Sequence, residues 1–519
     1  MSGRPLVLAL AAALCAVAAS AQEPAPAAEP AAEGASDAPA EAEASPPVAE
    51  AVFEEGLEAF RAGDTKLAAE KLWHYLSGND ASADHYEWAE FYLARSLEDR
   101  GLAHGAVEYY YNVAKERKRP ELLPDALRAL ERIMTTREHD RELLVDDLLG
   151  STEFGALPPD VRAFVEYHKG RLALLGGRDR WAERHFDRLE QVKADNPLAT
   201  RYLLKAKYAR AVRDLRTTHE RDSKAKRDKR DKARALLLEI ANAETDDFEL
   251  KNDARRTAAR LFFEEGDYNE ALKLYESIEV PFLSAEEATL FLEKAWTRYY
   301  AGDHRGALGI LLTLDAPSYR RYFRPERFVL KALAYKALCH YAASKGAARE
   351  LLRRYGDALN ELRRRRQPLA HPLMRRAAVQ AKQPRRTLTF LEALQRERQS
   401  AEAFSDAHGL RTHLAKLYDL KIAEVVRRLD AVVEEEAMKV AGDLLDYEEQ
   451  ARLVDYEVSL EVFRRLKKGT GKKIADEQKP IPVGGDDVYY VFGGEYWNDE
   501  LHDYRFRIEN RCFGGELFE

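Results

Sequence analysis

One internal spacing recurs five times between residues 56 and 311. A small residue is followed by Gly seven positions later, by Ala five positions after that, and by a large apolar residue after four more. Glycine allows a tight turn between two helices, and small residues let the helix axes approach, so that the large residue fills the groove beside them. The pattern therefore predicts antiparallel helix pairs. The five copies are Gly56-Gly63-Ala68-Leu72, Ala94-Gly101-Ala106-Tyr110, Gly170-Gly177-Ala182-Phe186, Ala259-Gly266-Ala271-Tyr275 and Ala295-Gly302-Ala307-Leu311.

The residue after the turn glycine supports this interpretation. It is Asp64, Asp267 or Asp303 in three of the copies. An aspartate at that place accepts a hydrogen bond from the unpaired amides of the following helix. We therefore expect each of these residues to begin the second helix of its pair.

The copies follow one another at a nearly constant distance. The anchor alanine advances by 38 residues from Ala68 to Ala106 and by 36 from Ala271 to Ala307. The 76 residues from Ala106 to Ala182 leave room for a degenerate helix pair at about 120–155. The 89 residues from Ala182 to Ala271 leave room for another helix pair with an insertion. A further divergent pair is expected at 325–355, around Ala347.

This spacing resembles that of the tetratricopeptide repeat (TPR) family, whose helix-turn-helix units of 34 residues stack into a solenoid. The resemblance covers about 300 residues and implies an all-α fold over 51–355. It also implies a concave groove lined by the first helix of each pair. The positions that would face the groove are Phe53, Leu57 and Phe60; Phe91, Arg95 and Glu98; Tyr167, Arg171 and Leu174; Arg256, Arg260 and Phe263; and Leu292, Trp296 and Tyr299.

Arginine and aromatic residues are typical of binding hot spots. The candidate partner-binding residues are Arg171, Arg256, Arg260, Trp296 and Tyr299. The alternative is that groove positions only complete the repeat core, which is the better interpretation for Phe53, Leu57 and Phe60.

The insertion at 217–232 is dense in Lys, Arg and Asp. A nucleic-acid patch is one interpretation. Interleaved acids and the absence of aromatic residues favour the other, a solvated helix extension stabilised by local ion pairs. The net charge of −8 also argues against nucleic-acid binding.

A charged region of long helices is expected at 356–470. Residues 356–398 are basic and include Arg363–Arg366, whereas the helix face from Tyr418 to Val432 leads into the acidic run Glu434–Glu436. The basic stretch could dock on this acidic helix or on an external anion. A coiled coil with a partner also stays open, although the heptads are short.

The C-terminal segment, 471–519, changes period. Residues 488–492 are β-branched and aromatic, and Tyr504, Phe506 and Ile508 alternate with charged residues, which predicts a small β-hairpin docked on the helices. Its loop gathers Glu495, Asp499, Glu500, His502 and Asp503. This cluster could hold a divalent cation or perform acid–base chemistry. The preferred interpretation is a polar loop, with no metal and no cofactor.

The N-terminus has the features of an export signal. Arg4, the apolar run 6–17 and the small-x-small site at 19–21 predict a signal peptide over 1–21. Residues 22–50 are rich in Ala, Pro and Glu and predict a disordered tether. Cys339 and Cys512 then remain. They could form a disulfide in an oxidising compartment or stay as two thiols.

These features favour a periplasmic scaffold that binds envelope proteins and is not an enzyme. Association with the outer membrane or cell wall stays open, as does the oligomeric state. Ala316–Tyr319 and Gly494–Leu501 are similar to segments of envelope TPR proteins of gliding bacteria, which implies a motility complex. An outer-membrane assembly machine and a glycan-processing enzyme that uses the C-terminal acidic cluster are the alternatives.

Overall fold

The computed structural model describes residues 48–116, 118–135, 142–192, 196–216, 223–467, 493–502 and 504–513. The predicted signal peptide and nearly all of the predicted tether lie outside these residues. The described chain is all-α and forms two compact units, one within residues 1–209 and 389–424, and one within 210–388 and 425–519. We call them unit one and unit two.

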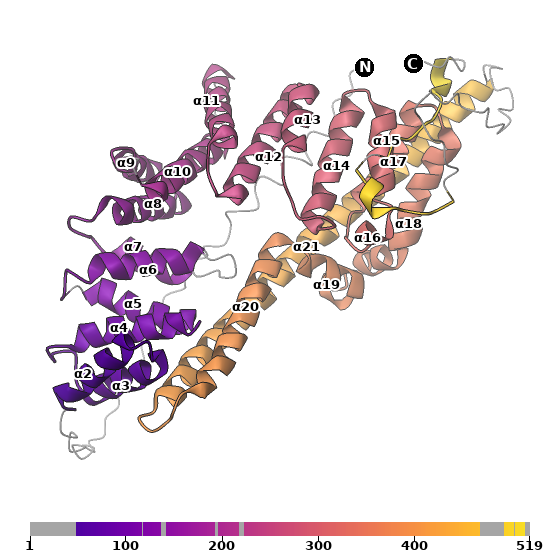
Figure 1. The fold of residues 1–519 in the computed structure, drawn as a ribbon. Coiled ribbons are helices and arrows are strands. Elements are labelled where there is room, and N and C mark those ends of the chain that lie inside the picture. Colours follow the sequence, from indigo (N-terminus) through magenta and orange to yellow (C-terminus); the bar gives the residue numbers. More distant parts are fainter. Residues whose placement is uncertain are drawn as a thin grey trace, which may run out of the picture. The chain divides into compact units, whose positions relative to one another are not determined.

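Figure 1 shows both units as stacks of paired helices. Unit one contains α2 (Glu50–Arg61), α3 (Thr65–Gly78), α4 (Tyr86–Asp99), α5 (Ala103–Glu116), α6 (Leu123–Thr135), α7 (Glu142–Ser151), α8 (Pro159–Leu175) and α9 (Asp179–Glu190). Unit two contains α11 (Ser223–Asn242), α12 (Phe248–Glu265), α13 (Tyr268–Glu276), α14 (Ala285–Tyr300), α15 (His304–Thr313), α16 (Pro317–Arg320), α17 (Glu326–Ala337), α18 (Tyr341–Arg363) and α19 (Pro372–Val379). Residues of α10 (Pro197–Arg216), α20 (Lys382–Ser400) and α21 (Leu410–Lys467) belong to both units.

The five predicted helix pairs are confirmed. They are α2–α3, α4–α5, α8–α9, α12–α13 and α14–α15. Each turn glycine has a left-handed backbone, with φ between +67° and +85°. Asp64, Asp267 and Asp303 cap the second helices, accepting hydrogen bonds from backbone amides at 3.1, 3.3 and 2.8 Å.

The small residues allow the close approach that the spacing predicts. Gly170 on α8 faces Phe186 on α9, and a Cβ at residue 170 would lie 2.4 Å from the phenyl ring. In the clearest copy, Ala259, Ala271 and Tyr275 are buried together in one apolar cluster. Burial of these anchors holds the two helices of each pair together.

The two gaps in which divergent pairs were predicted contain helices. Helices α6 and α7 occupy the gap at about 120–155, and α10 and α11 occupy the gap before α12. The charged insertion lies partly outside the described residues. From residue 223 onward it forms the first half of α11, where Arg230 pairs with Glu264 of α12 at 2.9 Å.

A sixth pair, α17–α18, follows the same spacing with altered residues. Its turn residue is Cys339, with φ +61°, seven positions after the buried Ala332. Ser344 takes the place of the anchor alanine and its hydroxyl donates to the Ala332 carbonyl at 2.7 Å. The pair was predicted around Ala347, but the residue in register with the other anchors is Ser344.

The predicted hairpin is wrong in its second strand, and its first strand lies outside the described residues. Residues 504–510 form no strand. The Tyr504 carbonyl instead approaches Gly309 of α15 so closely that a Cβ there would lie 2.3 Å away. Phe506 packs edge-on against Tyr335 of α17. This segment therefore packs against α15 through its backbone and against α17 through Phe506. The described part of the chain also contains no helix long and apolar enough to span a membrane.

Replacing Gly170 with alanine should destabilise unit one by about 1–3 kcal/mol, because the added methyl group would overlap the Phe186 ring. Urea unfolding followed by circular dichroism measures this change. Gly150→Ala on α7 is the matched control, since its Cβ would meet only Leu172 at 3.7 Å. Equal stability of the two variants would contradict the close-packing explanation.

Candidate protein-binding surface

Polar contacts join the first helices of successive pairs. In unit one, Arg132 of α6 pairs with Glu98 of α4 at 2.7 Å, and Arg128 pairs with Asp160 of α8 at 2.6 Å. Each contact spans about one repeat in sequence. These contacts add directional interactions to the apolar packing between repeats.

The three predicted arginines also pair with acids of neighbouring helices, and two of them join first helices of successive pairs. Arg171 on α8 pairs with Asp146 of α7. In unit two, Arg256 pairs with Glu293 of α14 at 3.3 Å, and Arg260 pairs with the same carboxylate. The arginine side chains retain about a fifth of their exposure. They therefore contact neighbouring helices and still reach the surface, and their role in partner binding stays a prediction.

Trp296 is more deeply buried than the arginines. It is 6% exposed, and its indole nitrogen donates to the Glu326 carboxylate of α17 at 2.6 Å. The Tyr447 hydroxyl of α21 donates to the same carboxylate. Burial raises the pKa of Glu326 to about 7, even though these hydrogen bonds and Arg324 act to lower it. Glu326 thus joins three helices of unit two.

Tyr299 belongs to a contiguous group of rings at the turn end of α12–α15. Phe263 meets Tyr300 with centroids 5.4 Å apart, and Tyr300 stacks on Trp296 at 5.9 Å. Tyr300 is 38% exposed. The rings present a partly exposed aromatic surface made by two successive repeats. We call this group the aromatic cluster: Phe263, Tyr268, Trp296, Tyr299, Tyr300 and His304.

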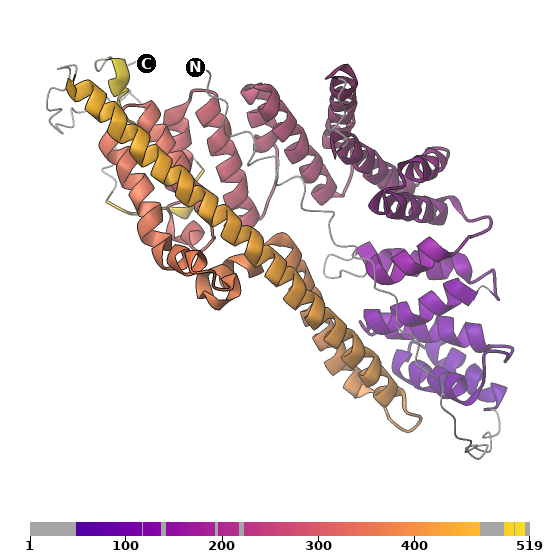
Figure 2. The ribbon, with the colours of Figure 1, turned by 180° about the vertical axis from the view of Figure 1, so that it is seen from behind.

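Within unit two, α21 packs against the last repeat. Val440, Leu444, Val454 and Val458 are buried in one apolar cluster with residues of α17 and α18. Figure 2 shows α21 running across these helices. Tyr447 extends the contact to the Trp296–Glu326 pair. A helix of the chain itself therefore covers part of the surface that the TPR resemblance assigns to a partner.

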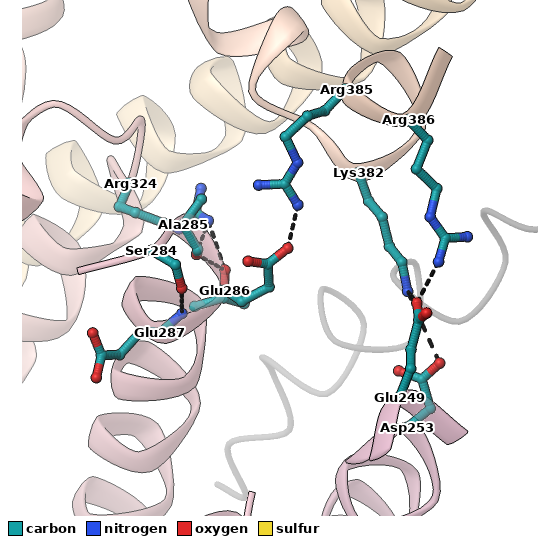
Figure 3. Close-up of polar contacts among 11 residues, drawn as sticks. Glu249, Asp253, Ser284, Ala285, Glu286, Glu287, Arg324, Lys382, Arg385 and Arg386 are labelled. Carbon is teal, nitrogen blue, oxygen red and sulfur yellow. Dashed lines mark hydrogen bonds and ion pairs between the residues drawn. The ribbon is translucent and has the colours of Figure 1, made fainter. Parts of the chain in front are cut away.

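The basic stretch makes contacts within the chain. Arg363 pairs with Glu448 of α21, so it reaches the acidic helix, although at a different place from the predicted Glu434–Glu436. Figure 3 shows that the first turn of α20 contacts the repeat helices and not the acidic helix. Arg385 pairs with Glu286 of α14, and Arg386 pairs with Glu249 of α12. Both groups of contacts lie inside unit two.

Opposing charges make this arrangement favourable. Lys382, Arg385 and Arg386 lie at a helix N-terminus, where positive charge opposes the helix dipole. Glu249 offsets that cost, with Lys382 at 3.1 Å. Burial acts to raise the pKa of Glu249, but Arg386 and Lys382 outweigh it and lower the pKa. The carboxylate is thus held in its charged form beside the basic turn.

The C-terminal acidic loop is docked on unit two. His502 lies 3.2 Å from the Glu287 carboxylate and 5.1 Å from the Phe291 ring. The Leu501 carbonyl accepts a hydrogen bond from Thr313 at 2.6 Å. Asp503 lies outside the described residues. Among those described, no group of three or more His, Cys, Asp or Glu residues is placed to hold a metal ion.

Cys339 and Cys512 form a disulfide, with Cα atoms 5.2 Å apart. The bond links the turn of the sixth helix pair to the C-terminal segment. A hydrogen bond from Arg511 N to the Leu338 carbonyl, at 3.1 Å, lies beside it. This settles the pairing that the sequence left open.

Sequence reasoning missed Tyr300, Glu293 and Glu326. Tyr300 was omitted because only three positions per helix were assigned to the groove. Acids about one repeat after two of the candidate residues were a usable signal: Glu293 follows Arg260 by 33 residues, and Glu326 follows Trp296 by 30.

Comparison with known proteins adds little beyond this geometry. No protein family and no curated protein matches the chain. Among solved structures, the chain is similar to the crystal structure of yeast Tom70, with 10% identity over 81% of this chain and 99% of that chain and a TM-score of 0.23. It is also similar to a circular tandem repeat protein with novel repeat topology, with 15% identity over 81% and 96% and a TM-score of 0.15. The TPR-like fold therefore rests on the chain's own helix pairs.

The pKa of Glu326 predicts a pH effect on stability. The ionised carboxylate is disfavoured in the folded state, so its contribution to stability should fall as pH rises from about 4.5 to about 7. Glu326→Gln stays neutral and should gain stability relative to the wild type over that interval. Thermal melting at about pH 5 and about pH 8 measures the difference. Glu279→Gln, an exposed position in unit two, controls for the lost charge. An E326Q difference from wild type that is equal at both pH values would refute the assignment.

Proposed function

We propose that this chain is an exported scaffold that binds partner proteins of a bacterial envelope through unit two. The observation that carries the proposal is the aromatic cluster, in which a buried Trp296 and partly buried rings support the exposed ring of Tyr300. Trp296 anchors it through Glu326, and Tyr300 presents its ring at the surface. Held aromatic rings lose little conformational entropy on binding, so they suit a protein interface.

The surroundings of the cluster support a protein partner. Arg256 and Arg260 lie on α12, the helix that also carries Phe263, and both keep partial exposure. Tyrosine, tryptophan and arginine are the residues enriched at hot spots. Because Glu293 already pairs with both guanidinium groups, a partner carboxylate would compete with it or share its place. A partner segment with apolar and acidic residues fits this surface best.

Two observations support export. The N-terminal sequence predicts a cleaved signal peptide, and the two cysteines beyond it form a disulfide. Disulfides persist in oxidising compartments such as the bacterial periplasm. Both observations support the periplasmic location that we propose for the scaffold. The identity of the partner protein would show whether this scaffold belongs to a gliding-motility complex or to an outer-membrane assembly complex.

Crosslinking in intact cells tests the binding proposal. A photoreactive amino acid at position 300 should crosslink a specific envelope protein, because this side chain is exposed within the aromatic cluster. The same group at Phe248, which is 53% exposed on α12, is the matched control. Tyr300→Ala should reduce co-purification of the captured partner about tenfold or more, as expected for a hot-spot residue, without changing the melting temperature by more than about 2 °C.

Two results would contradict this proposal. Equal crosslinking from positions 300 and 248 would show that capture is not specific to the cluster. Undiminished co-purification by both Tyr300→Ala and Tyr268→Ala would remove the cluster from the interface.

The localisation makes a separate prediction. The mature protein should begin at Gln22 and should contain no free thiol, because Cys15 is removed and Cys339 is joined to Cys512. Mass spectrometry of the protein from a periplasmic fraction, with and without reductant before alkylation, measures both properties. Retention of residues 1–21, or two alkylated cysteines without reductant, would argue against export.

A further inference from the structure

Helix α21 carries a second apolar face in unit two, separate from the one that packs on the repeats. Met438, Leu445, Tyr456 and Phe463 are 60%, 37%, 61% and 64% exposed. At 100° per residue they lie within about 20° of one direction, roughly opposite Val440, Val454 and Val458 of the buried face. A helix that is apolar on two sides is expected to have a partner on each.

The outward face follows a heptad pattern over about 37 Å of helix. From Met438 to Phe463 its positions are separated by alternating steps of four and three, and they are Met438, Gly442, Leu445, Glu449, Arg452, Tyr456, Ser459 and Phe463. Such a 4–3 alternation is the seam of a two-helix coiled coil. Leu453, 54% exposed, lies beside this seam and extends it.

The seam is symmetric about its midpoint, between Gln450 and Ala451. In an antiparallel pair of two such helices, residues equally distant from the midpoint lie opposite one another. Met438 then meets Phe463 of the second copy, and Leu445 meets Tyr456. The small residues Gly442 and Ser459 also face each other. A Cβ at residue 442 would meet nothing within its own chain, and the Ser459 hydroxyl, at the edge of the face, accepts a hydrogen bond from Lys345 of α18 at 2.8 Å.

The charges obey the same symmetry. Glu449 lies opposite Arg452, and Glu434, just before the seam, lies opposite Lys467, just after it. Arg452 also pairs with Glu448 of its own chain at 2.7 Å, but its side chain remains 59% exposed. A parallel pair in register would instead oppose Glu449 to Glu449 and Arg452 to Arg452. The charge pattern therefore selects the antiparallel arrangement.

We propose that two copies of this chain associate through the outward face of α21, as an antiparallel helix pair with a two-fold axis between Gln450 and Ala451. The interface is isologous, so each contact occurs twice. The buried Glu449–Arg452 pairs fix the register, as polar residues in coiled-coil seams do. The partner-binding surface of the proposed function is not needed for this association.

Sedimentation velocity of the full chain over a range of concentrations tests the proposal. The expected species has twice the mass of one chain. Tyr456→Glu should abolish it, because the new charge faces Leu445 at two places in the dimer. Leu420→Glu is the matched control: it alters a residue of the same helix that is 65% exposed and lies outside the paired range.

Charge reversal tests the register. Glu434 and Lys467 are about 50 Å apart within one chain, so they can meet only between copies. Glu434→Lys and Lys467→Glu should each weaken dimerisation about tenfold, since two ion pairs become two repulsions. The double variant should restore it, and an equal mixture of the two single variants should form a heterodimer.

Circular dichroism and melting curves confirm that each variant is folded. A chain that remains monomeric at about 100 μM, well above the concentrations at which specific homodimers usually form, would overturn the proposal. So would a dimer that Tyr456→Glu leaves intact. A dimer that needs Tyr456 but is not restored by the double charge reversal would also overturn it, because the antiparallel register would be wrong.

Discussion

The close approach of two helices at a small residue is the contact on which the rest of this structure depends. Where Gly170 faces Phe186, or Ala259 faces Tyr275, a large ring fills the groove beside a residue without a bulky side chain. This packing fixes the distance and angle between the two helices. The turn glycine and its aspartate cap then set where the second helix begins. Pairs built in this way present their first helices in register.

That register explains the polar contacts between repeats. The side chains of α12 reach α14 at Glu293, and those of α14 reach α17 at Glu326, because the first helices of successive repeats are neighbours. The arginines that resemble groove residues therefore also stabilise the stack. A partner that binds these arginines must compete with their ion pairs to Glu293. The neighbouring aromatic cluster is therefore favoured as the site of new contacts.

Helix α21 has two different apolar surfaces in unit two, one on each side of the helix. Its inner face completes the core of the last repeat and sends Tyr447 to Glu326, while its outer face is apolar and symmetric. The basic first turn of α20 is neutralised by Glu249 and Glu286 of the repeats. The basic residues of α20 are thus paired with acids of the same chain. The apolar residues on the outer face of α21, in contrast, are exposed.

The sequence by itself determined the helix pairs, their turns and their caps, because these depend on contacts between residues close in the chain. One turn and its packing are specified almost entirely by four residues close in sequence, which are Gly266, Asp267, Ala271 and Tyr275. Even the sixth pair obeys the spacing, with Cys339 in the place of the turn glycine.

Contacts between residues distant in sequence were decided only by the tertiary structure. The pairing of Cys339 with Cys512, and of Arg386 with Glu249, depends on where whole helices lie. The predicted hairpin was wrong for the same reason: the alternation of Tyr504, Phe506 and Ile508 indicates that every second side chain is partly covered, but not what covers it. Helices α15 and α17 supply that surface, and a period of two in one short segment carries no information about them.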